Sequence, residues 1–260
     1  MPFAQPTFRS AFLSVLILTL PGIAATKAAA EIDPEADRIL QAMCTYLSGL
    51  KSFSFQTDSS IEAVLQTGQK IQLAASGSGI FDREQGFRFQ RKGEAADLEM
   101  IFDGLKLTLF SPGLNRYKTV EVESGGNDAA LDEVRASFGV EAVSGADLLY
   151  SNPCDGLKFD VTDGAYFGEA WIGGRKAHHL GYRAAEVDWQ LWINAEGDPM
   201  PLKYVITSKW VTAAPQFTMQ LRDWDATATV SRGDLAFSPP DGASELEPAD
   251  IAALSAEGKE

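Results

Sequence analysis

The sequence contains few of the side chains that commonly bind metals or carry out enzyme chemistry. Its 260 residues include only two histidines and two cysteines. It has no His-Glu-x-x-His zinc motif, no Cys-x-x-Cys pair, no Gly-x-Ser-x-Gly elbow and no glycine-rich phosphate or dinucleotide loop. These absences exclude the common signatures of zinc proteases, α/β-hydrolases and nucleotide-binding enzymes. We therefore expect a non-enzymatic protein with no cofactor, no bound metal and no catalytic residue.

Basic residues are also few relative to acidic ones. There are 22 Lys and Arg against 36 Asp and Glu, which gives a formal net charge of −14 at pH 7. Such a chain is repelled by nucleic acid and by anionic membrane surfaces, so we expect neither as its main partner. The many carboxylates leave one enzymatic hypothesis open. This is a hydrolase that uses converging carboxylates, or a serine near His179, in a cleft.

The longest apolar run of the chain lies near its N-terminus. A mostly apolar stretch at 11–20 follows Arg9 and ends at Pro21. The small residues 28–30 supply a signal-peptidase site, so we predict a cleaved signal peptide over residues 1–30 and export to the periplasm. The alternative, an N-terminal anchor helix, needs a longer run to span a bilayer. No later stretch is long enough to do so, and we expect no stable membrane anchor after cleavage.

The rest of the chain is predicted to form one domain over residues 31–240. We find no internal repeat and no second domain boundary in it. The segment 241–260 is an acidic tail rich in alanine and proline. Its end is expected to be disordered.

Cys44 and Cys154 form an even pair in a chain that is expected in an oxidising compartment. They are therefore a candidate disulfide. Two separate buried thiols are the alternative, because the sequence gives no distance between the two residues.

Secondary structure is expected to begin with a helix and to continue as strands. Residues 33–50 have apolar side chains at helical spacing, with Asp33 as the cap and Pro34 in the first turn. From Lys51 onward the apolar period changes to two, which is typical of strands. Strands are expected at 71–81, 86–90, 98–102, 105–110, 116–122, 165–174, 176–184, 186–194, 202–210 and 216–224.

A short helical insert is expected between the two groups of strands. Asn127 is the predicted cap of a helix that ends near Phe138. Ser144 is the predicted cap of a second helix, in which Asp147 completes a capping box.

Two hairpins have sequence signals that fix a register. The pair Asp-Gly at 103–104 predicts a two-residue turn, which sets Phe102 against Leu105 and Met100 against Leu107. One face of this hairpin is then apolar and the other mostly polar, so the register is self-consistent.

The two histidines, His178 and His179, are adjacent on the predicted strand 176–184. Adjacent strand residues point to opposite faces, so these two cannot readily bind one metal. A turn at 185–186 predicts that His179 opposes Trp192 and is an ordinary strand residue beside it.

Aromatic residues, including all five tryptophans, are spread over the strand-like segments. We predict an α+β, mainly β fold, in which a curved antiparallel sheet wraps around an N-terminal helix and the short helical insert. The apolar face of such a sheet is too large for these helices to cover. It must close on itself, dimerise or hold an apolar ligand.

The segments GLKLTLFSPGLNRY, ADLLY, AYFGEAWIGGRKAHHLGYR, VDWQLWI, PLKYVIT and FSPPDGA resemble a bacterial family of predicted periplasmic proteins catalogued only as a domain of unknown function. The resemblance extends over nearly all of the chain after residue 30. The chain departs from the family at Ala177, where such sequences often have a cysteine. Members are similar in architecture to lipoprotein carriers of the LolA/LolB type. The resemblance therefore implies an unclosed half-barrel with an apolar cavity for acyl chains. No catalytic or binding residue is established for the family, so the resemblance assigns none.

The leading functional prediction is a periplasmic protein that binds or shields an apolar ligand, such as acyl chains or a lipidated polypeptide, in the concavity. The alternative is a protein-interaction module of the cell envelope with a packed, ligand-free core, which pairs with an envelope protein through its sheet edge or outer face. The candidate wall residues of the ligand site are Met100, Leu107, Tyr182, Trp189, Leu191, Tyr204 and Phe217.

Overall fold

The computed structural model describes residues 31–94, 96–138 and 145–247. The predicted signal peptide, the predicted cap at Ser144 and the end of the acidic tail lie outside these residues. The helices are α1 (Pro34–Gly49), α2 (Gly126–Phe138), the short 3₁₀ turn η2 (Ala146–Leu148) and α3 (Pro153–Leu157). The strands are β1 (Ser52–Val64), β2 (Lys70–Asp82), β3 (Gly86–Gly93), β4 (Leu98–Phe102), β5 (Lys106–Ser111), β6 (Arg116–Glu121), β7 (Asp163–Ile172), β8 (Arg175–Arg183), β9 (Val187–Asn194), β10 (Pro201–Ser208), β11 (Gln216–Asp225) and β12 (Ser244–Glu245).

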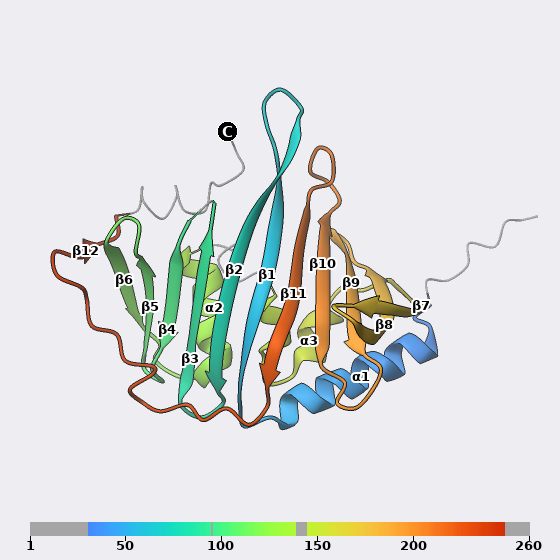
Figure 1. Cartoon of the computed structure of the whole chain (residues 1–260), viewed down its shortest axis with the longest axis horizontal. Helices are drawn as coiled ribbons and strands as arrows, with labels where there is room; N and C mark the ends of the chain where they lie inside the picture. Colours follow the sequence, from blue (N-terminus) through green and yellow to red (C-terminus); the bar gives the residue numbers. More distant parts are fainter. Residues whose placement is uncertain (1–30, 95, 139–144, 248–260) are drawn as a thin grey trace, which may run out of the picture.

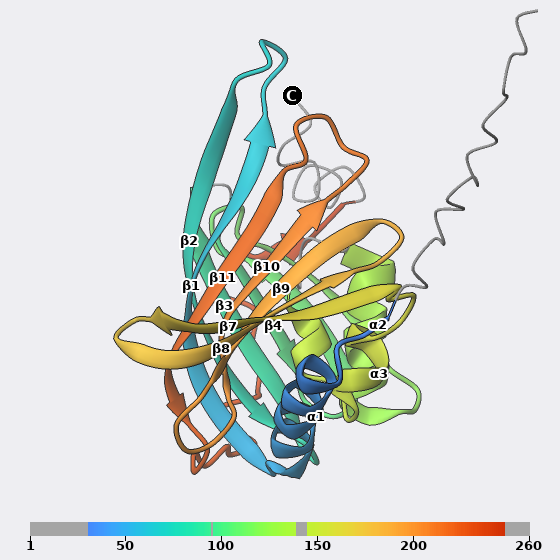
Figure 2. The ribbon, with the colours of Figure 1, turned by 90° about the vertical axis from the view of Figure 1, so that its right-hand side faces the viewer.

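The described strands form one sheet in the order β12-β6-β5-β4-β3-β2-β1-β11-β10-β9-β8-β7 (Figure 1). Neighbouring strands are antiparallel except β12 and β6, which run parallel. β7 and β12 end this order without pairing to each other, so the barrel is not closed. The helices α1, α2 and α3 lie on one side of the sheet, its concave face (Figure 2). The structure confirms the predicted mainly-β, unclosed antiparallel half-barrel.

Helix α1 lies within the predicted range. The Asp33 carboxylate accepts a hydrogen bond from the Glu35 backbone N–H at 2.8 Å, and Pro34 opens the first turn. Apolar side chains three or four residues apart form one buried stripe, which packs onto the concave face. The stripe consists of Ala36, Ile39, Leu40, Met43, Cys44 and Leu47.

A disulfide joins α1 to α3. The Cα atoms of Cys44 and Cys154 are 5.7 Å apart, and the two residues are separated by 110 positions in the chain. The sequence leaves open a disulfide or two separate thiols, and the structure shows the disulfide. Both cysteines belong to the hydrophobic core that α1 and α3 share with β8–β11, so the bond holds both helices against this part of the sheet.

The β8–β9 hairpin has the predicted register. His179 pairs with Trp192, and Arg183 pairs with Asp188. The turn is closed by a hydrogen bond from the Ala184 N–H to the Val187 carbonyl at 2.9 Å. The two histidines therefore lie on opposite faces of the sheet.

The predicted register of the β4–β5 hairpin is wrong by two residues. Phe102 pairs with Leu107 rather than with Leu105. The Asp103 carboxylate accepts hydrogen bonds from the backbone N–H groups of Leu105 and Lys106, at 2.9 and 2.7 Å, which lengthens the connection. A shift of two residues leaves every side chain on its predicted face.

The helical insert differs from the prediction at its first expected cap. α2 begins at Gly126, so Asn127 lies inside the helix, and its side chain donates to the Asp82 carbonyl at 2.9 Å. The predicted capping box at Asp147 involves Ser144, which lies outside the described residues. The Asp147 carboxylate accepts a hydrogen bond from Arg135 at 2.5 Å, and the segment around it forms only the turn η2.

The described chain still pairs with the sheet after the predicted boundary at 240. The Leu246 N–H donates to the Tyr117 carbonyl at 2.7 Å as β12 pairs with β6. Phe237 packs against Phe110 and Tyr117, with ring centroids 5.5 Å away in both cases. In Figure 1 this C-terminal segment runs along the lower edge of the sheet from β11 to β12.

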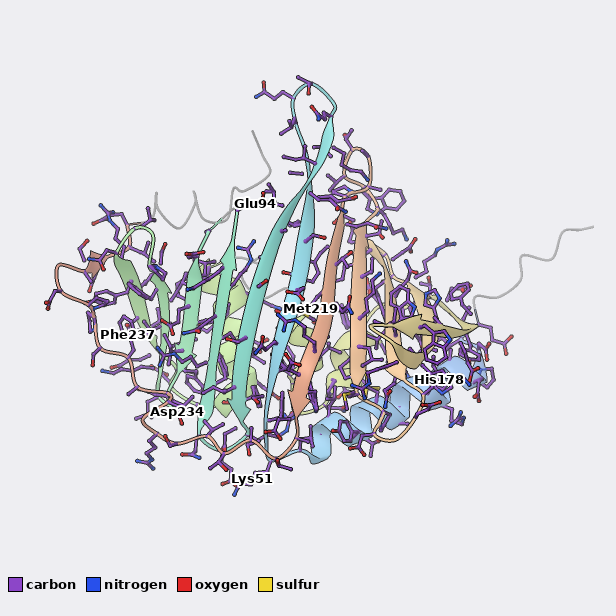
Figure 3. The ribbon with its side chains drawn as sticks, in the orientation of Figure 1. Lys51, Glu94, His178, Met219, Asp234 and Phe237 are labelled. Atoms are coloured by element: carbon purple, nitrogen blue, oxygen red, sulfur yellow. A yellow bond between two sulfur atoms is a disulfide. The ribbon has the colours of Figure 1, made fainter. Side chains whose placement is uncertain are left out.

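Two hydrophobic clusters fill the concave face. One packs α1 and α3 with their disulfide against β8–β11, and we call β7–β11 with these helices the cystine half. The other packs α2 against β1–β5 through many phenylalanines, and we call β1–β6 with α2 the phenylalanine half. Leu50, Phe55 and Trp224 pack against both clusters. Figure 3 places Met219 near the middle of the sheet, between His178 toward one end and Phe237 toward the other.

Candidate ligand-binding hollow

The side chains of the concave face change from large to small and back to large along β1 and β2. Paired residues of neighbouring strands point to the same face, so the register gives the composition of each row. The successive concave pairs are Phe53–Phe81, Phe55–Gly79, Thr57–Gly77, Ser59–Ala75 and Ile61–Leu73. We call Thr57, Gly77, Ser59 and Ala75 the small-residue belt. It leaves the middle of the face with little side-chain volume, between aromatic and aliphatic rows.

A hollow of about 130 Å³ lies over Thr57, Ser59 and Gly77 of the small-residue belt. Phe217 and Met219 of β11 extend its sheet wall, and the segment 145–149 around η2 forms the opposite wall. Cavities of about 150 Å³ hold a benzene-sized molecule, whereas drug-sized sites begin at about 300 Å³. The hollow therefore fits a ring or a short length of acyl chain rather than a whole lipid.

An aromatic floor borders the hollow on the side of the two cores. The Phe55 ring centroid lies 6.1 Å from that of Phe89 and 5.8 Å from that of Trp224. Gly79 is required here, because a Cβ at this position would lie 2.5 Å from the Phe55 ring and 2.8 Å from the Phe89 ring. The indole N–H of Trp224 donates to the Tyr46 hydroxyl at 3.3 Å, and burial raises the pKa of Tyr46. The floor is thus held in place without a charged group.

The wall opposite the sheet is fixed by close contacts and hydrogen bonds. Gly145 has φ of +92°, and a Cβ there would lie 2.6 Å from the terminal methyl of Met219. Next to it, Arg135 of α2 donates to the Asp147 carboxylate at 2.5 Å and to the Tyr150 hydroxyl at 3.0 Å. These contacts hold the segment around η2 between α2 and β11.

Arg83, in the turn between β2 and β3, ties this wall to α1. Its guanidinium donates to the carbonyl oxygens of Leu47 at 2.7 Å and Leu50 at 3.1 Å, at the end of α1. It also donates to those of Leu149 at 3.3 Å and Tyr150 at 3.4 Å, just after η2. Burial lowers the pKa of Arg83. One cation therefore binds carbonyl groups at the ends of two helical segments.

Of the seven predicted wall residues, only Phe217 lines the hollow. Tyr182, Trp189, Leu191 and Tyr204 pack in the core of the cystine half, and Met100 and Leu107 pack in the core of the phenylalanine half. All seven were chosen for apolar alternation. That pattern identifies the concave face but does not show which rows the helices cover.

The sequence prediction missed the small-residue belt. Its signal is the run TDSS at 57–60 followed by AASGSG at 74–79, because small residues at alternate positions of two paired strands leave a gap on one face. The segment 145–149 carries no comparable signal, since its role depends on where the chain returns to the sheet.

The histidines lie outside the hollow. His179 stacks on Trp192 at 4.2 Å between centroids, its Nε2 is 3.0 Å from the Gln190 side-chain oxygen, and burial lowers its pKa. His178 shares a hydrogen bond of 3.0 Å with the Tyr166 hydroxyl. In the described part of the chain, no three His, Cys, Asp or Glu side chains are grouped to hold a metal ion.

These features define an open antiparallel half-barrel with helices on its concave face and an apolar hollow where its two cores meet. Among the residues described, none of the helices has the length and apolar character needed to span a bilayer. The chain belongs to the family described as "Predicted periplasmic protein (DUF2092)", which it matches over residues 36–247. This match confirms the predicted family and the predicted periplasmic location.

Several solved structures are similar at low sequence identity. An uncharacterized conserved protein from Thermus thermophilus is 12% identical, with 82% of this chain and 99% of that chain covered and a TM-score of 0.46. LprF from Mycobacterium bovis is 14% identical, with coverage of 78% and 98% and a TM-score of 0.45. A LolA superfamily protein from Nitrosomonas europaea is 11% identical, with coverage of 78% and 97% and a TM-score of 0.34. Comparison with curated proteins gives no match.

Proposed function

We propose that this protein binds the apolar part of a ligand, such as an acyl chain, in the hollow, without catalysing a reaction. One observation carries the proposal: an apolar hollow lies between the small-residue belt and a wall held by Arg83 and Arg135. A pre-formed, mostly apolar site with few polar groups is typical of small-molecule binding. The acyl chain of a free lipid and that of a lipidated polypeptide would occupy the site in the same way.

The aliphatic row beside the belt extends the surface available to a chain. Ile61, Leu73 and Phe217 are each only partly buried, and Ile61 pairs with both of the others. Each buried methylene contributes about 0.8 kcal/mol, so about six of them contribute about 5 kcal/mol before the cost of ordering the chain. Binding of this strength is reversible, which a carrier or a shield requires.

Native mass spectrometry provides the first test. Residues 31–260 would be produced by export and kept unextracted before measurement. The expected result is a mass excess equal to that of a lipid, which organic extraction removes. A bare mass, together with no uptake of a fluorescent fatty acid, would contradict the proposal.

A pair of neighbouring serines provides a matched test of the site. Ser59 lies in the belt, whereas Ser60 points to the opposite face of the same strand. Ser59→Leu fills the hollow and is expected to abolish uptake of a fluorescent fatty acid, while Ser60→Leu leaves it unchanged. Thermal unfolding of both variants controls for folding. Equal uptake by the two variants would place the ligand elsewhere.

A second candidate, a protein-interaction module, is supported by the edge strand β7. Phe167 and Trp171 on this strand are 63% and 70% exposed, and β7 is the last strand of the sheet. A partner strand added to β7 would cover both rings. Photo-crosslinking from position 171 in exporting cells tests this candidate. This candidate predicts a crosslink to one specific partner, and Phe167→Asp should abolish that crosslink. Such a result, together with a bare mass in native mass spectrometry, would favour protein interaction over ligand binding.

A further inference from the structure

Arg91 is the one charged residue in the described lining of the hollow. This lining contains no Asp or Glu, although the chain has 36 acidic residues. Arg91 lies on β3 opposite Gly77, which in turn pairs with Thr57. Thr57, Gly77 and Arg91 thus form one row across three strands. Because Gly77 has no side chain, the Thr57 hydroxyl can lie over it, on the way to the arginine: a Cβ on Gly77 would be only 2.6 Å from the Thr57 Oγ1.

The guanidinium of Arg91 has donors to spare. It donates one hydrogen bond to the Ala96 carbonyl at 3.2 Å, and within the described residues it forms no ion pair. Arg88, on the opposite face of the same strand, is instead paired with Glu99, with 2.5 Å between nitrogen and oxygen. An arginine has five N–H donors, so most of those of Arg91 are available to a ligand.

We infer that the ligand carries an anionic head, a carboxylate or a phosphate, which binds Arg91 while its acyl chain lies in the hollow. This inference rests on the proposed function, because it assigns the other end of the same ligand. A guanidinium binds two oxygens of such a head at once, and the Thr57 hydroxyl can donate from the far side of Gly77. The apolar walls beside the contact lower the local dielectric constant, which strengthens it.

The net charge of the protein makes this local arrangement necessary. A chain with a net charge of −14 repels free anions at long range. An anionic ligand therefore binds only where a cation stands alone, and a carboxylate near Arg91 would compete for its donors. The described residues that line the hollow include Arg91 and no Asp or Glu, so they meet this condition.

Three probes with the same chain test the head group: dodecanoate, dodecyl phosphate and dodecanol. Binding to the full chain after residue 30 would be measured by isothermal titration calorimetry. We expect the two anions to bind more tightly than the alcohol. We expect Arg91→Gln to weaken anion binding about tenfold to a hundredfold, the range for hydrogen bonds to a charged group, and to leave dodecanol binding unchanged. Dodecanol binding thus also reports that the variant is folded.

Lys92 offers the matched control, since it is the next residue of β3, points to the opposite face and is exposed. Lys92→Gln changes the net charge by the same amount and should leave all three affinities unchanged. Arg91→Lys should retain part of the anion affinity, because a lysine contacts an oxyanion as a point charge.

The outcomes distinguish the proposed function, binding of an acyl chain, from the inference that the ligand has an anionic head. If no probe binds, dodecanol included, the proposed function fails. If dodecanol binds as tightly as both anions, or if Arg91→Gln weakens anions no more than Lys92→Gln does, the anionic head is refuted while chain binding stands. A preference for dodecanoate over dodecyl phosphate would assign the head to a fatty acid, and the reverse preference to a phospholipid-type ligand.

Discussion

The cystine half and the phenylalanine half hold their helices against the sheet by different means. In the cystine half a covalent bond joins α1 to α3, and the buried stripe of α1 covers β8–β11. In the phenylalanine half, stacked rings form the core, and α2 is tied to β2 by the Asn127 side chain. The cystine half is therefore stabilised by a covalent cross-link, and the phenylalanine half by the packing of its rings.

The hollow lies where these two cores meet. In the segment around η2, Leu148 belongs to the core of the cystine half, whereas Ala146 and Leu149 belong to that of the phenylalanine half. A small displacement of one half relative to the other would change the hollow without unfolding either core. Ligand entry can therefore be coupled to movement at the junction between the two halves rather than to global unfolding.

Removing the disulfide should have the largest effect and should act on the cystine half first. We expect Cys44→Ala/Cys154→Ala to lower the free energy of unfolding by about 4–5 kcal/mol, the chain-entropy value for a loop of about a hundred residues. Urea unfolding measures the loss, and hydrogen exchange should show it mainly in α1, α3 and β7–β11. Reduced wild-type protein should match the variant. Equal loss of protection in β1–β6 would contradict separate cores.

A core phenylalanine provides the reciprocal change. Phe81 is fully buried and stacks on Phe53 and Phe87, at 5.1 and 6.0 Å between centroids. Phe81→Ala should lower the free energy of unfolding by about 3–4 kcal/mol, because it removes apolar surface and leaves a cavity. Exchange should increase mainly in β1–β6 and α2. The control is Leu105→Ala, at a side chain that is 72% exposed, which should change stability by less than about 0.5 kcal/mol.

Breaking the junction should have a smaller effect on stability and a larger one on the hollow. Arg83→Leu removes the hydrogen bonds that join the end of α1 to the wall after η2. We expect a loss of about 2–3 kcal/mol in the free energy of unfolding. Uptake and release of a fluorescent fatty acid should both become faster, as stopped-flow fluorescence would show. Unchanged rates would mean that this wall does not control access.

Features that local sequence signals determine could be predicted in both halves. Local signals were sufficient for α1, with its cap at Asp33, and for the β8–β9 register, which a tight turn sets. The β4–β5 register failed because the Asp103 side chain accepts two N–H groups and lengthens the turn. The faces were still right, since the error was an even number of residues.

The hollow could not be predicted in the same way. Its walls come from β1–β3, from β11 and from the segment around η2, which are far apart in the chain. The apolar alternation identified the concave face, but six of the seven chosen residues lie in the two cores, beneath helices whose positions depend on the disulfide, on Arg83 and on Asn127. Arg91 gave no local signal either, because its significance comes from the absence of a carboxylate in the described lining of the hollow.

Mild acid should produce the smallest effect, and it should again distinguish the two halves. Both histidines lie on β8, so the phenylalanine half has none. Burial lowers the pKa of His179 in the folded protein below its ordinary value of 6.5. The unfolded chain therefore takes up the proton first as the pH falls. The stability that neutral His179 contributes is fully present above about pH 6.5 and is lost as the pH falls toward the folded pKa.

Because the ring is only partly buried, solvent screens this effect, and we expect a loss of about a few tenths of a kcal/mol between about pH 7 and pH 5.5. Urea unfolding at the two pH values measures it. His179→Phe keeps a ring on Trp192 and should remove the dependence. Hydrogen exchange at the lower pH, corrected for its intrinsic rate, should rise in β7–β10 alone. An equal rise in β1–β6 would mean that carboxylates, which both halves contain, dominate the response, and the two cores would then share one acid sensitivity.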